Sequence, residues 1–455
     1  MMRVPRPSLL PRLAIIAGVL LLLVHFRSRL WTSCFFCSDA STSSDHTWRS
    51  GAPAGPAKEK DLACRHLPGA DKALLVIKTG STELEAKLPV HLKTTILCYH
   101  DYLIFSDFDD DFEGEKIIDA LESVSTSIKE THPDFALWRR LQKGHQGRLA
   151  LTYDDKHRPT NPDGGRVNME NPGWLLDKWK FLPMMIRTYQ EFPNKPWYVF
   201  VETDTFIFWH GMLQYLERLG HTAPWYVGGM IEAEGIQFAH GGSGFLVSQP
   251  AMKMVTNILL GAKKQTHWEN VTDHQWAGDC VLGQAFAKSG TGLQFAWPML
   301  QGNSVVDMDY SDHTFWCSPA VSYHHVPPSL VEQLWKFEQE WIASFKGKTP
   351  RTITHGDVFE KFVLPQTTRP RSGWNNLSDQ QESDVNSAEE CIALCQQTSS
   401  CLQYSFNTAQ GVCYTTDHRP NIGEAQEGVE SGWINERMQQ FLATRKNKCD
   451  DVHWD

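Results

Sequence analysis

The sequence lacks an excess of positive charge, and it contains no run of basic residues. Its 43 Lys and Arg are outnumbered by 53 Asp and Glu, which gives a net charge of −10. Proteins that bind nucleic acid need a basic surface, and no helical recognition motif is present either. We therefore exclude a general nucleic-acid-binding function.

The sequence also lacks a clear cleavage site after its N-terminal apolar run. This run, Leu13–Phe26, has 14 residues behind three arginines, and as a helix it would span roughly 21 Å of a ~30 Å hydrocarbon core. Its length alone fits a signal-peptide core as well as an anchor. Because no small-x-small site follows, we expect an uncleaved signal anchor over 13–26, with residues 1–12 in the cytosol. Two glycosylation sequons, at Asn270 and Asn376, agree with a lumenal location for the rest.

The cysteines from Cys391 onward contain no CxxC pair, so disulfides are far more common than a metal site in such a segment. The chain has 11 cysteines, an odd number, and at least one of them is therefore unpaired or intermolecular. An oxidising lumen would favour disulfides throughout. Cys64 could pair with Cys98, and Cys280 with Cys317, although spacing alone proves neither pair.

The segment Trp197–His210 (WYVFVETDTFIFWH) places two carboxylates between apolar runs. The first of these runs, Trp197–Val201, is rich in aromatic and β-branched residues and predicts a buried strand. Glu202 and Asp204 are two residues apart and so lie on the same side of an extended chain. Two acids at a buried strand end are costly unless they are solvated, protonated or bound to a cation. Two interpretations stay open locally: a divalent metal that holds a diphosphate, and two solvated acids.

Alternating strand and helix signals from residue 73 onward predict an α/β domain with a largely parallel sheet. The first strands expected are Ala73–Lys78, Thr94–Leu97 and Tyr102–Phe105. Ligands of such sheets bind at the carboxyl ends of the strands. Thr79, Asp107 and the two acids of the later strand would all lie there, which supports a binding site.

Other polar segments are weaker signals. His240–Gly244 (HGGSG) allows close backbone approach to a ligand, or only a tight turn. Asp279 lies in a predicted helix beside a cysteine, and His324 and His325 stand at a predicted strand end before a double proline. Asp109–Asp111 has no apolar strand before it and predicts a solvated loop.

Composition divides the chain further. Residues 27–72 include a stretch rich in Ser, Gly, Pro and Ala, and they predict a flexible stem. Residues 73–345 form the expected α/β domain, and residues 346–373 a linker or an extension of that domain. Residues 374–455 carry the clustered cysteines and predict a small disulfide-stapled α+β module.

Four motifs together resemble the Fringe and core 1 β1,3-galactosyltransferase group of glycosyltransferase family 31, most closely its fungal members. WYVFVETDTFIFW resembles the strand with the family's DxD metal motif, and HGGSGFLVS its glycine-rich segment. GDCVLG resembles the segment of the catalytic base, and SYHHVPP the region whose His completes the metal site. The four occur in the family's order. The first departs from the family pattern, because ETD replaces a triple Asp and Thr203 takes the middle position.

The resemblance implies a GT-A (Rossmann-like) fold and an inverting transfer of a hexose, galactose or N-acetylglucosamine, from a UDP-sugar. The acceptor would be a hydroxyl of a glycan or glycoprotein, in β1,3 linkage. Mn²⁺ or Mg²⁺ would be held by Asp204 and His324 with Glu202 beside them, and Asp279 would be the base. The family is typically found in the Golgi membrane as single-pass type II proteins.

We also expect further residues to lie around the donor. Thr79 and Asp107, at strand ends, would meet the nucleotide. Gly241, Gly242 and Gly244 would shape the floor under the donor sugar or the acceptor.

The C-terminal segment resembles a PAN/Apple domain, a small disulfide module that binds proteins or carbohydrates. This resemblance suggests the pairs Cys395–Cys401 and Cys391–Cys413 and leaves Cys449 without a partner inside the module.

Two alternative functions remain. A catalytically inactive GT-A domain could serve as a lumenal lectin or chaperone, with the PAN module as its working part. A metal-dependent hydrolase would need more His or carboxylate ligands than the sequence assembles.

Overall fold

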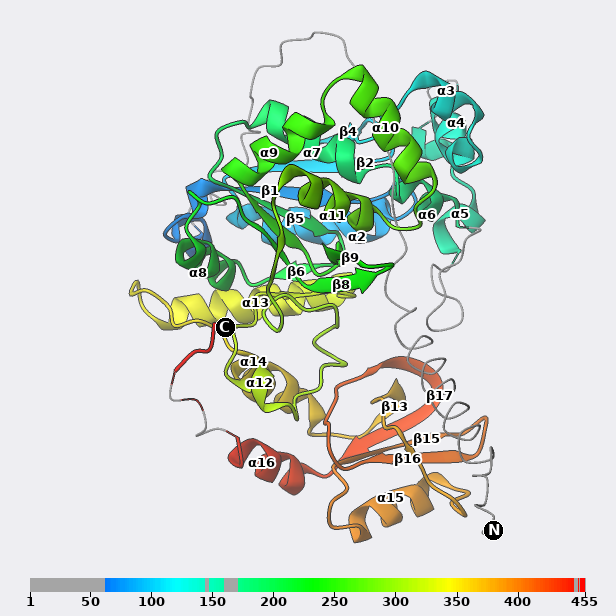
Figure 1. Cartoon of the computed structure of the whole chain (residues 1–455). Helices are drawn as coiled ribbons and strands as arrows, with labels where there is room; N and C mark the ends of the chain where they lie inside the picture. The colour runs from blue at the N-terminus through cyan, green and yellow to red at the C-terminus, as the bar shows by residue number, and fades with distance from the viewer. Residues whose placement is uncertain (1–61, 144–146, 159–170, 446–448, 450, 455) are drawn as a thin grey trace, which may run out of the picture.

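The computed structural model describes residues 62–143, 147–158, 171–445, 449 and 451–454. These residues form a large α/β part and a smaller part below it that contains β13–β17 and α15 (Figure 1). The expected cytosolic tail, the anchor at 13–26 and nearly all of the stem lie outside the described residues. Among the residues that are described, no helix is long and apolar enough to cross a membrane.

The α/β part is built on an eight-stranded sheet with the order β11-β7-β10-β5-β1-β2-β4-β3. β1 (Ala73–Lys78) is central and fully buried, and it pairs in parallel with β2 (Asp101–Ser106) and β5 (Trp197–Glu202). The pairs β2–β4 and β7–β11 are also parallel, whereas β10 is antiparallel to both neighbours and β3 to β4. The sheet is therefore mixed, not largely parallel throughout. Its other strands are β3 (Asp110–Phe112), β4 (Glu115–Asp119), β7 (Tyr226–Gly228), β10 (Phe245–Ser248) and β11 (Leu293–Phe295).

Helices cover both faces of this sheet. Leu75 and Ile77 of β1 point into one apolar cluster and Leu74 and Val76 into another, as the alternation of side chains along a strand requires. The first cluster is completed by α2 (Leu84–Lys93), α8 (Trp209–Leu219) and α13 (Pro328–Ser344). The second is completed by α7 (Phe181–Glu191), α9 (Gln249–Leu259), α10 (Ala262–Asp273) and α11 (Gly278–Ser289).

Shorter elements surround this core. A side cluster gathers α4 (Ala136–Gln142) and α6 (Pro172–Asp177), near α3 (Thr126–Thr131) and α5 (Tyr153–His157). β6 (Phe206–Ile207) pairs with β12 (Ser322–Tyr323), and β8 (Met230–Ala233) pairs with β9 (Ile236–Ala239). α12 (His313–Trp316) lies between β11 and β12 in the chain, and α14 (His355–Val358) precedes the smaller part.

The order of strands marks a switch point beside β1. Its sequence neighbour β2 lies on one side and β5 on the other, so the chain reverses direction across the sheet between β1 and β5. In α/β sheets the crevice at the carboxyl ends of such strands binds ligands. Lys78 and Glu202, the last residues of β1 and β5, lie opposite each other in register at this point.

The smaller part is a five-stranded antiparallel sheet, β13-β17-β15-β16-β14, with α15 (Ala388–Gln397) against it and α16 (Asn435–Ala443) after it. The strands are β13 (Arg371–Asn375), β14 (Gln380–Gln381), β15 (Gln403–Asn407), β16 (Val412–Thr416) and β17 (Glu424–Trp433). A third apolar cluster spans both parts and includes Phe206 and Tyr323 from one and Leu402 and Trp433 from the other. The two parts therefore share a continuous core.

Two local predictions were wrong. Thr94–Leu97 is not a strand: Thr95–Cys98 is a 3-10 helix, because a four-residue apolar run does not distinguish a strand from one buried helical turn. Asp109–Asp111 is not wholly a loop, since Asp110–Phe112 forms the edge strand β3 against β4. Pairing with β4 holds these residues in an extended conformation, which the local sequence does not predict.

The disulfides confirm three expected pairs and correct a fourth. Cys64–Cys98, Cys391–Cys413 and Cys395–Cys401 are bonded. Cys280 does not pair with Cys317: it is a buried thiol in α11, and Cys317 bonds to Cys449 instead. Cys449 thus finds its partner outside the smaller part, as part of the link between the two.

The asparagines of the two sequons differ in their exposure to solvent. Asn270 is exposed on α10. Asn376 is 0 % exposed, and its amide donates hydrogen bonds to the carbonyls of Tyr404 (3.0 Å) and Gly432 (3.2 Å). A glycan on Asn376 is incompatible with this fold.

Candidate active site

A cavity of about 610 Å³ lies at the carboxyl ends of β1 and β5. We call it the central cavity. Its lining combines charged, imidazole and hydrophobic side chains, among them Lys78, Lys87, Asp177, Lys180, Glu202, Asp204, Met230, Asp279, Phe295, Trp297, His324 and His325.

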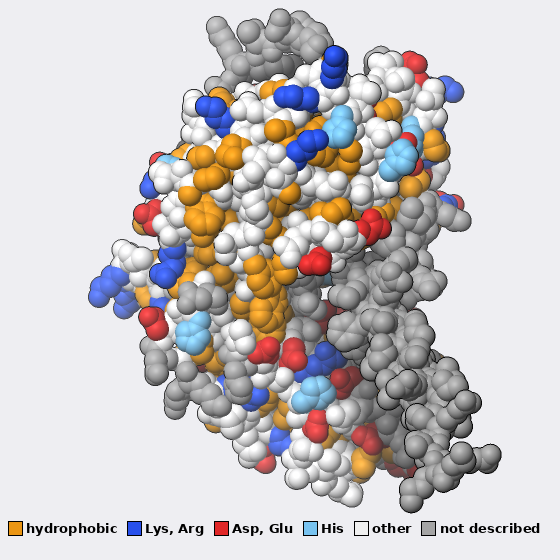
Figure 2. All heavy atoms as spheres, viewed as in Figure 1, with side chains coloured by type: hydrophobic (Ala, Val, Ile, Leu, Met, Phe, Trp, Pro, Cys, Tyr) orange, Lys and Arg blue, Asp and Glu red, His pale blue; other side chains and the backbone are white. Residues whose placement is uncertain are grey.

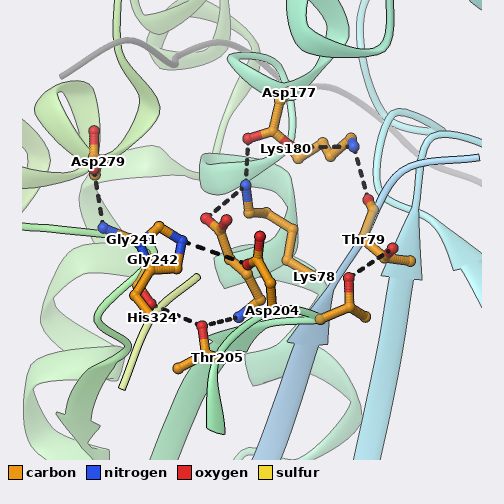
Figure 3. A network of polar contacts seen from close by, with 12 residues as sticks. Lys78, Thr79, Asp177, Lys180, Asp204, Thr205, Gly241, Gly242, Asp279 and His324 are labelled. Atoms are coloured by element: carbon orange, nitrogen blue, oxygen red, sulfur yellow. Dashed lines mark hydrogen bonds and ion pairs between the residues drawn. The ribbon is translucent and has the colours of Figure 1, made fainter. Parts of the chain in front are cut away.

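Asp204 is held by the turn that follows β5. In this turn Thr205 Oγ1 accepts a hydrogen bond from the Glu202 N–H (3.2 Å) and donates one to the Gly242 carbonyl (2.7 Å), which ties the turn to the glycine-rich segment (Figure 3). The Asp204 carboxylate lies 2.9 Å from Lys87 Nζ. The turn therefore fixes where this carboxylate enters the cavity.

The charge of Asp204 is strongly favoured. Burial would raise the pKa of its carboxyl, but Lys87 and His324 outweigh burial and hold the pKa well below the usual range. His324 Nε2 lies 3.4 Å from Asp204 Oδ1, and this contact raises the pKa of the imidazole against the opposing effect of its burial. The Asp204 side chain is thus an ionised carboxylate.

His325 joins these two residues. Ligand atoms of Asp204, His324 and His325 all lie within 4.8 Å of one another. His324 Nδ1 is buried with no hydrogen-bond partner among the described residues, and His325 has a left-handed backbone with φ of 53°. One carboxylate and two imidazoles are donors that suit a divalent transition metal such as Mn²⁺, so the residues present fit a metal. The sequence indicated His325 only as the neighbour of His324.

Glu202 makes a different set of contacts. Its Oε1 is 3.0 Å from Lys78 Nζ, and Lys78 also pairs with Asp177. Burial raises the pKa of Glu202, and Lys78 opposes that rise. Glu202 lies outside the group of three potential ligands, so its contact with a metal or donor stays a prediction. Sequence reasoning missed Lys78 and Asp177.

Asp279 lies in the first turn of α11 and faces the central cavity. Its carboxylate accepts hydrogen bonds from the backbone N–H groups of Gly241 (3.0 Å) and Cys280 (3.1 Å). Burial raises its pKa to about 7, although the Gly241 hydrogen bond acts in the other direction. A carboxylate with a pKa near neutrality is suited to take a proton from a hydroxyl.

Comparison with protein-family models gives two matches. A Fringe-like model matches residues 70–294, and a PAN domain model matches residues 367–433. The chain contains a Fringe-like domain and a PAN domain. No curated protein matches the chain. A Fringe-like domain implies a glycosyltransferase, and the match includes Asp204 and Asp279, whereas His324 lies beyond its end.

The glycines of the Fringe-like domain have separate roles. The Gly241 N–H binds Asp279, as described. A Cβ on Gly242 would lie 2.2 Å from the ring of His324, so only glycine lets the imidazole approach the turn. Gly244 has φ of 78°, a conformation that favours glycine.

Thr79 and Asp107 lie behind the cavity wall. Both are buried and neither is among the side chains that line the central cavity. Thr79 Oγ1 is 3.2 Å from Thr203 Oγ1, and Asp107 accepts hydrogen bonds from the N–H (2.5 Å) and hydroxyl (3.0 Å) of Ser81. They order the turns after β1 and β5, and their expected contact with a nucleotide stays a prediction.

Proposed function

We propose that the protein is an inverting, metal-dependent glycosyltransferase that moves a hexose from a UDP-sugar to a hydroxyl of a glycan or glycoprotein. The observation that carries the proposal is the joint presence of two kinds of group in the central cavity. One is the cluster of Asp204, His324 and His325, and the other is Asp279 with its raised pKa. The Fringe-like domain supports the reaction class.

Inversion needs one displacement at the anomeric carbon. The acceptor oxygen forms a bond to this carbon, the bond to the diphosphate oxygen breaks, and UDP leaves. The acceptor proton passes to the Asp279 carboxylate, a transfer that typically contributes 10²–10⁴-fold. The backbone N–H groups of Gly241 and Cys280 keep that carboxylate oriented.

The leaving diphosphate carries negative charge that must be balanced. Asp204, His324 and His325 would hold Mn²⁺ or Mg²⁺, with Glu202 as a further contact, and the bound ion would neutralise the departing phosphate oxygens. Lys87, which pairs with Asp204, and Lys180, which pairs with Asp177, also line the cavity. Lys180 Nζ is fixed by the Thr79 carbonyl at 2.8 Å.

The cellular setting is also a proposal. The four disulfides of the described residues agree with an oxidising compartment. We propose a Golgi membrane protein anchored through residues 13–26, with a catalytic domain over 73–345. The PAN domain, proposed over residues 374–455, would bind a protein or carbohydrate ligand.

A donor screen tests the proposed activity. Purified protein is incubated with a panel of UDP-sugars and glycan acceptors with Mn²⁺, Mg²⁺ or EDTA, and UDP release and product mass are measured. We expect turnover that needs the metal, that Asp204→Ala abolishes without a change in circular dichroism, and that the exposed-site control Asp111→Ala retains. Wild-type-like turnover by Asp204→Ala would refute the proposed metal site. The absence of turnover with every donor would refute the proposed glycosyltransferase activity.

A further inference from the structure

One wall of the central cavity has no part in the chemistry proposed so far. Met230, Phe295 and Trp297 line the cavity, yet they are 39 %, 45 % and 38 % exposed. Only three other large hydrophobic side chains are exposed in the part of the chain that the structure describes. Exposed apolar side chains that line a cavity commonly mark a ligand site. Figure 2 shows hydrophobic side chains gathered in the middle of the face on which β8 lies.

The aromatic rings of this wall are fixed in place. Phe295 ends β11 and Trp297 follows two residues later. Their ring planes are within 2° of parallel, with centroids 6.3 Å apart. Phe315 packs edge-on against Trp297 with centroids 5.0 Å apart. The pair is therefore a preformed aromatic platform rather than two independent side chains.

The platform lies away from the charged part of the cavity. Lys78 ends β1 and Lys87 belongs to α2, which follows β1, and Lys180 bonds to the carbonyl of Thr79. Phe295 ends β11, at the far edge of the sheet and four strands from β1. A diphosphate needs the cations, which assigns the donor to the β1 side and leaves the platform to the acceptor.

We propose that Phe295 and Trp297 form an acceptor subsite that binds the apolar face of a pyranose ring. This proposal rests on the proposed function and names the two side chains that would hold the acceptor sugar. A pyranose presents a face of C–H groups, and an aromatic face offers these a large, rigid contact area. Gln301 and Asn303 also line the cavity and offer polar groups for the sugar hydroxyls.

The test uses methyl glycosides of common hexoses and pentoses as acceptors and a Ser/Thr-containing peptide without sugar for comparison. We expect transfer to at least one glycoside and none to the peptide. Trp297→Ala should raise the acceptor KM about tenfold, the upper effect of one aromatic contact. The donor KM and acceptor-independent UDP-sugar hydrolysis should stay within about twofold of wild type, because the charged side is untouched.

Two controls separate the platform from general damage. Trp297→Phe keeps an aromatic face and should restore most of the acceptor affinity. Leu260→Ala removes a hydrophobic side chain of similar exposure (43 %) outside the cavity and should have no effect. A raised donor KM with an unchanged acceptor KM would assign the ring to the nucleotide and overturn the proposal. Efficient transfer to the sugar-free peptide would also overturn it.

A binding measurement keeps this test independent of turnover. If the protein transfers no sugar, which refutes the proposed function, saturation-transfer NMR with the same glycosides still reports on the platform. Binding by wild type that Trp297→Ala loses supports a pyranose subsite. Equal signals for both proteins, or none for either, refute it.

Discussion

The substitution Asp279→Asn should make the protein more stable and almost inactive at the same time. The carboxyl of Asp279 has an ordinary pKa of 3.8, which burial raises to about 7 in the folded protein. The folded state therefore binds this proton more tightly than the unfolded state does. Its contribution to the free energy of unfolding is largest at low pH and falls as the pH rises from about 4 to about 7.

The size of this effect follows from the pKa difference. About three pKa units correspond to roughly 4 kcal/mol, the penalty for the ionised Asp279 above neutrality. The asparagine of the variant would not ionise, but its amide can accept from only one of the two backbone N–H groups without a clash of donors, which costs about 1–3 kcal/mol. We expect a net gain of about 1–3 kcal/mol at pH ~8.

Urea unfolding of the metal-free protein at pH ~5 and pH ~8, on either side of the folded-state pKa, measures this gain, and transfer assays measure catalysis. The variant should lose about 10²–10⁴-fold in kcat/KM, and the wild-type rise in kcat/KM with pH near 7 should disappear. Asp111→Asn, at an exposed position, is the matched control. Transfer within about tenfold of wild type would show that Asp279 is not the base. A stability difference that does not change with pH would show that its pKa is not raised.

Three further predictions concern other parts of the fold. Gly242→Ala should weaken Mn²⁺ binding in calorimetry at least about tenfold, because the new Cβ would lie 2.2 Å from the imidazole of a proposed ligand; unchanged affinity would contradict this ligand set. Cys317→Ser should lower the free energy of unfolding by about 2–5 kcal/mol, because the bond to Cys449 closes a loop with a sequence separation of 132; an unchanged urea midpoint would contradict that. In protein secreted from eukaryotic cells, peptide mass spectrometry should find glycan on Asn270 and none on Asn376, and modification of the latter would show that its burial is wrong.

The core strands could be predicted from sequence because their apolar runs are long and continuous. Ala73–Lys78 is β1 residue for residue, and Trp197–Val201 falls within β5. Short elements could not be predicted in this way. The 3-10 helix at Thr95–Cys98 and the edge strand at Asp110–Phe112 depend on neighbours elsewhere in the chain.

The candidate site likewise contains some residues that local sequence motifs predict and others that only the fold brings together. Asp204 and Asp279 stand in recognisable motifs, and the structure brings both to the central cavity. Lys78 carries no local signal, because its partner Asp177 is 99 positions away along the chain. His325 becomes a candidate metal ligand only because the structure places it close to Asp204 and His324.

The third apolar cluster makes the PAN domain part of the cooperative folding unit. A chain ended at residue 294, where the Fringe-like match stops, would leave Phe206 and Phe208 without the later residues that bury them. If the PAN domain were replaced by one from another protein, the new domain would have to supply apolar side chains that fit the third cluster. A substitution at Leu402 or Trp433 would therefore alter the cluster that also contains Phe206 of β6, the strand that follows the turn of Asp204.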